Sequence, residues 1–201
     1  MKPRRTYIIL ILTLFSFQII IAQTINDFEH IRPHGRIEKT AQLNDYISFM
    51  ASKKKSVENR KYYKTKALNL FMGKGYDYEE NGKLKEGVMM EITSVNKKSV
   101  SHQLMRDYFD SVICLKYTDV KITSTEIANI KISSLKPIDD SLYVCTCQYD
   151  QAFVGYRDGR PVYNDITTKR IKCYVYAEDT EDGTEYITLL GDVSALAVRR
   201  L

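Results

Sequence analysis

The chain has 201 residues, with 30 lysines and arginines, 25 acidic residues and no tryptophan. Residues 1–22 carry Lys2, Arg4 and Arg5 and no acidic residue, so their removal would lower the formal charge from +5 by three, to +2. A nearly neutral mature chain lacks the concentrated basic surface of a nucleic-acid-binding protein, and we expect no nucleic-acid partner.

The first 22 residues have the pattern of a secretory signal peptide. Residues 1–5 are cationic, residues 7–21 are almost wholly apolar, and the small Ala22 precedes the predicted cleavage site. We therefore expect an exported protein, in the periplasm, at the cell surface or secreted. The apolar run is also close to the length of a membrane span, so an uncleaved anchor is the alternative. Only that alternative would make the membrane a partner.

Helices are predicted in the first half of the chain. Residues 23–36 are interpreted as a lead-in loop, because Pro33 disfavours helix before it and Gly35 permits a turn. Residues 37–201 are expected to form a single α+β domain. One helix is predicted over residues 38–52, and a second between the N-cap Ser56 and Gly73. The polar, glycine-containing residues 74–87 predict an exposed loop.

Strands dominate the second half. Residues 88–92 predict a short strand, and the apolar periodicity of residues 103–115 predicts a third helix. Residues 142–154, 162–176 and 186–198 then alternate between apolar and polar, and Asp-Gly pairs at 158–159 and 182–183 separate them. This order predicts an α+β fold, in which N-terminal helices pack on a curved, cone-like antiparallel sheet.

The register of the central hairpin follows from its apolar faces. Matching the face of Tyr143, Cys145, Cys147 and Tyr149 to that of Ile171, Cys173 and Val175 sets Cys145 opposite Cys173 and Tyr149 opposite Lys169. A slip of one residue would turn Ile171 to the other face. This register favours an odd-numbered loop centred on Gly159 over a two-residue turn.

The order of elements over residues 38–198 resembles the nuclear transport factor two-like, or cystatin-like, fold superfamily. The resemblance rests on element order and strand length, and no motif supports it. It implies a sheet wrapped around helices into a cone, a small-molecule pocket inside the cone, and dimers through the open sheet face. Enzymes of this family use Asp, His or Tyr groups inside the cone, and none can be matched here residue by residue.

Four cysteines in an exported chain raise the question of disulfides. Cys145 and Cys173 are the predicted pair because they face each other across two strands. The alternative is four small, buried, free thiols. The Cys145-x-Cys147 pair lacks the second pair or the histidines of a zinc site, so we predict no metal and no cofactor.

Four side chains are candidates for a polar-ended pocket: Tyr143, Tyr149, Lys169 and Glu126. The alternative is that the tyrosines only pack in the core. The three histidines are not spaced as part of a nucleophilic site.

We predict an exported, non-catalytic binding or assembly protein whose partner is an unknown small molecule or protein. The alternatives are a small-molecule enzyme using Tyr149 or Glu126, and a membrane-anchored subunit of an envelope assembly.

Overall fold

The computed structural model describes residues 34–201 except 81, 97–98, 125–129, 140 and 182. Its helices are α2 (His34–Ala51), α3 (Val57–Leu68) and α4 (Met105–Ile113), and a short 3-10 helix, η1 (Met72–Gly75), follows α3. No helix in this part of the chain is long and apolar enough to cross a membrane.

The strands of the main sheet are β3 (Met89–Ile92), β4 (Ser101–Leu104), β5 (Asp119–Ser124), β6 (Lys131–Ile132), β7 (Lys136–Pro137), β8 (Leu142–Arg157), β9 (Arg160–Thr180) and β10 (Gly183–Arg199). These eight strands are ordered β4-β3-β10-β9-β8-β5, with β6 and β7 also paired to β8. The pairings are antiparallel except that β10 runs parallel to β3. A separate hairpin joins β1 (Tyr78–Glu80) and β2 (Lys83–Lys85).

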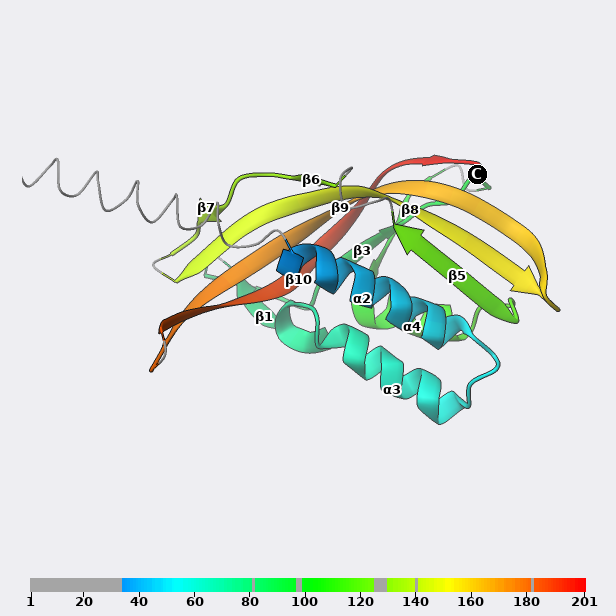
Figure 1. The fold of residues 1–201 in the computed structure, drawn as a ribbon, viewed down its shortest axis with the longest axis horizontal. Coiled ribbons are helices and arrows are strands. Elements are labelled where there is room, and N and C mark those ends of the chain that lie inside the picture. Colours follow the sequence, from blue (N-terminus) through cyan, green and yellow to red (C-terminus); the bar gives the residue numbers. More distant parts are fainter. Residues whose placement is uncertain (1–33, 81, 97–98, 125–129, 140, 182) are drawn as a thin grey trace, which may run out of the picture. The chain divides into compact units, whose positions relative to one another are not determined.

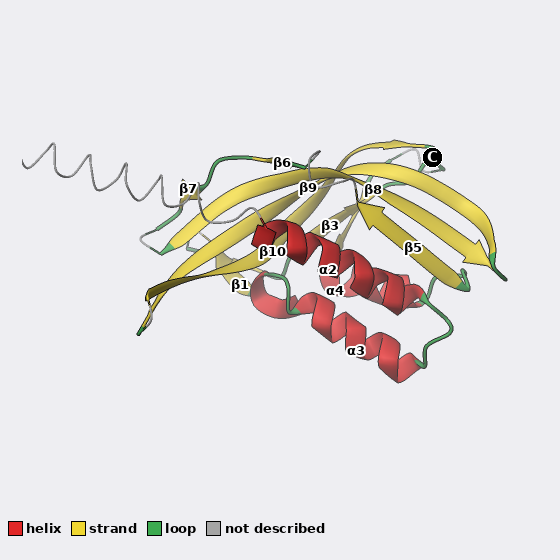
Figure 2. Cartoon of the chain, viewed as in Figure 1, coloured by secondary structure: helices red, strands yellow, loops and turns green. Residues whose placement is uncertain are grey.

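The helices and the sheet form successive layers, and the sheet curves over α2 and α4 (Figure 1). α2 lies along β5, and α3 contacts the other two helices (Figure 2). α4 packs beside β3 and β4. Between the layers lie fully buried side chains such as Ile47, Phe109, Ile171 and Leu190. Burial of this apolar surface holds the layers together. The predicted α+β class, with helices packed on a curved sheet, is confirmed.

The predicted register of the central hairpin is confirmed, but its predicted loop is wrong. Cys145 pairs with Cys173, Cys147 with Ile171, and Tyr149 with Lys169. The connection is nevertheless a two-residue turn, in which Asp158 and Gly159 have φ of 52° and 78°. A β-bulge reconciles the two observations. Gly155 pairs with Tyr163 but Tyr156 pairs with Pro161, so β9 has one extra residue there, and the predicted register is kept with a two-residue turn.

The starts of the first and third helices differ from the sequence predictions. α2 begins at His34, so residues 34–36 of the predicted lead-in loop are helical, and the rest of that loop lies outside the described residues. Gly35 makes no positive-φ turn there, and the buried Arg36 holds the first turn against β8. Residues 101–104 are strand β4 because they pair with β3, and the third helix therefore starts at Met105.

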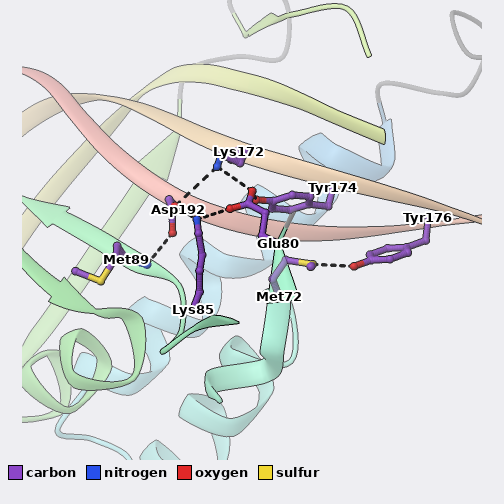
Figure 3. A network of polar contacts seen from close by, with 8 residues as sticks. All are labelled: Met72, Glu80, Lys85, Met89, Lys172, Tyr174, Tyr176 and Asp192. Carbon is purple, nitrogen blue, oxygen red and sulfur yellow. Dashed lines mark hydrogen bonds and ion pairs between the residues drawn. The ribbon is translucent and has the colours of Figure 1, made fainter. Parts of the chain in front are cut away.

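The prediction of an exposed loop over residues 74–87 is also wrong, because β1 and β2 lie there. Figure 3 shows how this hairpin is held against the sheet. Glu80 accepts hydrogen bonds from Lys172, at 3.1 Å, and from Tyr174, and it pairs with Lys85. Lys172 and Tyr174 alternate with Cys173, so the hairpin covers the face of β9 opposite the thiols. Asp192 joins the group by accepting from Lys85 and from the backbone N–H of Met89.

Candidate functional site

The inner face of the central hairpin changes character along its length. Because side chains alternate across a strand, every second residue of β8 and β9 faces the helices. From the start of β8 this face carries thiols, then Tyr149 opposite Lys169, Gln151 opposite Thr167, and Phe153 opposite Asp165. The charged end therefore lies toward the β8–β9 turn, and the thiols lie at the other end.

A cavity of about 460 Å³ opens over the charged end, between α4, β3, the loop after β3 and the β8–β9 hairpin. This volume is within the range of small-molecule sites. Aromatic and aliphatic groups make up much of its lining, including Tyr108, Val112, Leu115, Tyr117, Phe153 and Tyr163. Lys169, Asp165, Thr167 and Gln151 supply polar groups from the sheet. Two hollows of 350 and 470 Å³ near the β8–β9 turn have no buried charged side chain in their lining.

Lys169 is the buried cation of this cavity, with only 7% of its surface exposed. Burial lowers the pKa of its amine to about 8, and the charge of Asp165 partly opposes this shift. Among the described residues, no hydrogen bond or ion pair to the amine is found. A buried ammonium without a direct partner is costly, so this position favours a ligand that supplies an acceptor.

Asp165 lies four residues before Lys169 on the same face of β9 and is 4% exposed. Burial raises the pKa of its carboxyl group, and a hydrogen bond from the hydroxyl of Tyr163 works against that change. Burial and the same contact raise the pKa of Tyr163 to about 12, so its hydroxyl is neutral at pH 7. Asp165 thus accepts a hydrogen bond within the protein, whereas the Lys169 amine donates none to an acceptor among the described residues.

The sequence candidates have separate places in the structure. Lys169 lines the cavity, and Tyr149 lies beside it, next to a void of about 10 Å³. The hydroxyl of Tyr149 is buried without a hydrogen-bond partner, and burial raises its pKa well above the usual value. Tyr143 lies beyond the thiols and is not part of the cavity lining. Glu126 lies outside the described residues.

Sequence reasoning missed Asp165 and the contribution of α4. Asp165 and Lys169 are four residues apart on one strand, so their side chains face the same side. The alternation that placed Lys169 on the inner face therefore also placed Asp165 there. Tyr108 and Val112 could not be placed in the same way, because their contact with the cavity depends on how α4 packs against the sheet.

The thiols form a second cluster on this inner face. The sulfur atoms of Cys145, Cys147 and Cys173 all lie within 4.8 Å of one another, and the three residues are at most 3% exposed. Hydrogen bonds from the Cys147 and Cys173 thiols, together with Arg36, lower the pKa of Cys145. Hydrogen bonds with Cys145 and Cys147, together with burial, raise the pKa of Cys173. All four cysteines are free in the structure. A Cys145–Cys173 disulfide stays a prediction that thiol counting under denaturing, non-reducing conditions tests.

Comparisons with known proteins give one distant structural similarity. No protein-family model matches the chain, and no curated protein matches it significantly. Among solved structures, it is similar to the crystal structure of a "Putative Scytalone Dehydratase" from Novosphingobium aromaticivorans, with a TM-score of 0.44 and 8% identity over 88% of this chain and 91% of that one. At this level of similarity, the activity in that name is assigned to that protein alone.

Proposed function

We propose that this chain is an exported member of the nuclear transport factor two-like superfamily that binds a small, mainly apolar carboxylic acid in the cavity over β8 and β9. One observation carries the proposal: Lys169 is a buried residue of the cavity lining, and among the described residues only the charge of Asp165 offsets the cost of burying its ammonium. Export rests on the pattern of residues 1–22, and the family on the order of elements.

The cavity matches such a ligand at both ends. A carboxylate near Lys169 would neutralise the buried ammonium and accept a charge-assisted hydrogen bond. Asp165 already accepts a hydrogen bond from Tyr163, so it competes less for the amine. The rings of Tyr117, Phe153 and Tyr163 lie within 6.3 Å of one another and offer apolar surface for the body of the ligand.

A matched pair of probes tests this function. We expect isothermal titration calorimetry to show that 2-naphthoate binds at least about 10-fold more tightly than the neutral 2-naphthamide, because only the acid gains an ionic hydrogen bond. Lys169→Met should remove this preference. Lys61→Met, which changes an exposed lysine on α3, is the matched control and should leave both affinities unchanged. Equal binding of the two probes to the wild-type protein, or no binding of either, would contradict the proposal.

A second candidate function is proton-transfer catalysis in the same cavity. It is favoured by the pKa of Lys169, about 8, which leaves a fraction of the amine neutral and able to act as a base at pH 7. Tyr149 is a weaker candidate because its raised pKa keeps the hydroxyl protonated. Exchange of the α-protons of 2-tetralone, a ketone with a fused aromatic ring, with D₂O, lost in Lys169→Met, would favour this function over simple binding.

Two further sequence predictions, the cleavage of the leader and a homodimer, can each be tested separately. A mature N-terminus at Gln23, measured by mass spectrometry, would exclude the membrane-anchored subunit. A homodimer through the open sheet face would raise the mass measured by light scattering. On that face the structure has polar pairs such as Thr168 with Asp150 and Arg170 with Gln148.

A further inference from the structure

The thiols of Cys145, Cys147 and Cys173 form a cluster between the sheet and α2. Cys145 and Cys147 share the inner face of β8, and the register places Cys173 of β9 opposite Cys145. The Cys147 and Cys173 sulfurs are 3.5 Å apart, and all three sulfurs lie within 4.8 Å of one another. Three sulfurs bound at about 2.3 Å to a central ion would lie about 4 Å apart. Small side-chain rotations would therefore bring the cluster to trigonal geometry.

The set of donor atoms restricts which ion could bind. Among the described residues, no histidine, aspartate or glutamate adds a ligand atom to the group. Structural zinc sites take four ligands and this cluster supplies three, whereas Cu(I) is another soft ion that thiolates select. On one side of the cluster, Arg36 Nη1 lies 3.1 Å from the Cys145 sulfur. A guanidinium has no acceptor atom and cannot act as a ligand, but its positive charge would offset the excess negative charge of three thiolates around a monovalent ion.

The sequence alone predicted no metal, because the Cys145-x-Cys147 pair lacks a second pair or histidines. From the cluster that Cys173 completes, we infer instead that Cys145, Cys147 and Cys173 form a trigonal binding site for one Cu(I) ion, with Arg36 as an outer-shell cation. The thiols bind as thiolates, and their protons pass to solvent. The site is separate from the cavity, because none of the three cysteines lines it. Entry of the ion requires a local opening, since each cysteine is at most 3% exposed.

Competition for copper tests the inference. Reduced full-length protein is equilibrated overnight, without oxygen, with the coloured Cu(I) complex of bicinchoninate. We expect one equivalent of Cu(I) to transfer to each chain, with an ultraviolet sulfur-to-copper charge-transfer band. Cys147→Ala and Cys173→Ala should each lower the affinity by about 100-fold or more. Arg36→Met should lower it by about 10-fold, as for an outer-shell partner.

Cys114→Ser is the matched control, because Cys114 is exposed and lies outside the cluster. It should bind copper as tightly as the wild-type protein. The inference is wrong if the wild-type protein takes no copper while thiol counting shows the cluster reduced. It is also wrong if Cys147→Ala and Cys173→Ala retain full affinity, or if a Cys145–Cys173 disulfide persists in protein purified without oxygen. The titration of the wild-type protein alone can refute the copper site, so the test does not depend on whether the variants fold.

Discussion

Replacing Lys169 with methionine should raise the free energy of unfolding by about 3 kcal/mol at pH 7. The pKa of this amine is about 8 in the folded protein against an ordinary value of 10.5, because burial disfavours the charged form. Methionine has a similar length and no charge to desolvate. Asp165 keeps its hydrogen bond from Tyr163 in the variant, so no second buried group loses its donor. Urea unfolding at a series of pH values measures the effect.

The gain should depend on pH in a defined direction. Below pH 8 the amine is charged in both states, and the folded wild-type protein bears the full cost of burying that charge. Between pH 8 and 10.5 the folded protein loses the proton first, so wild-type stability rises and the advantage of Lys169→Met shrinks. Lys172→Met, on the same strand, should instead be destabilising because it removes an ion pair with Glu80. A destabilised Lys169→Met variant, or a gain that does not change with pH, would contradict the assignment of a buried cation.

Replacing Glu80 with glutamine should lower the free energy of unfolding by about 2 kcal/mol at pH 7, less than the pKa shift alone implies, because its partners Lys85 and Lys172 are about one third exposed and solvent screens the network. Burial alone would raise the pKa of Glu80, but hydrogen bonds from Lys85, Tyr174 and Lys172 outweigh it and lower the pKa to about 2 from 4.5. The carboxylate therefore stabilises the fold above pH 4.5, and this contribution is lost as the pH falls from 4.5 to 2.

The measurement is acid unfolding of Glu80→Gln beside the wild-type protein, followed by circular dichroism. We expect the two stabilities to differ at pH 7 and to converge near pH 2. Glu79→Gln is the matched control, because the neighbouring Glu79 is exposed. A loss of stability in Glu80→Gln that stays constant down to pH 2 would show that packing, not the charge network of Figure 3, holds the β1–β2 hairpin.

The sequence predicted the features that local alternation determines. The pairing of Cys145 with Cys173 and of Tyr149 with Lys169 followed from two apolar faces, because a one-residue slip would turn Ile171 away from the core. The two-residue turn was missed because the bulge that compensates for it does not interrupt the alternation of apolar and polar residues in a recognisable way over residues 155–163. The alternation of side chains between the two faces of a strand also placed Lys169 and the three thiols on the inner face.

Features that depend on distant contacts could not be predicted. The β1–β2 hairpin looks like a polar loop in the sequence, since its anchors are Lys172, Tyr174 and Asp192, about a hundred residues away. Strand β4 competes with the start of the third helix, and pairing with β3 decides between them. The cavity exists because of how α4 packs, so only its sheet side was available to sequence reasoning.

The most direct test of the proposed function is a crystal structure of the protein with 6-bromo-2-naphthoate, in which anomalous scattering locates the bromine. We predict that the carboxylate lies within hydrogen-bond distance of the Lys169 amine and that the ring lies among Tyr117, Phe153 and Tyr163. A probe bound elsewhere, or a cavity without the probe at saturating concentration, would contradict the account.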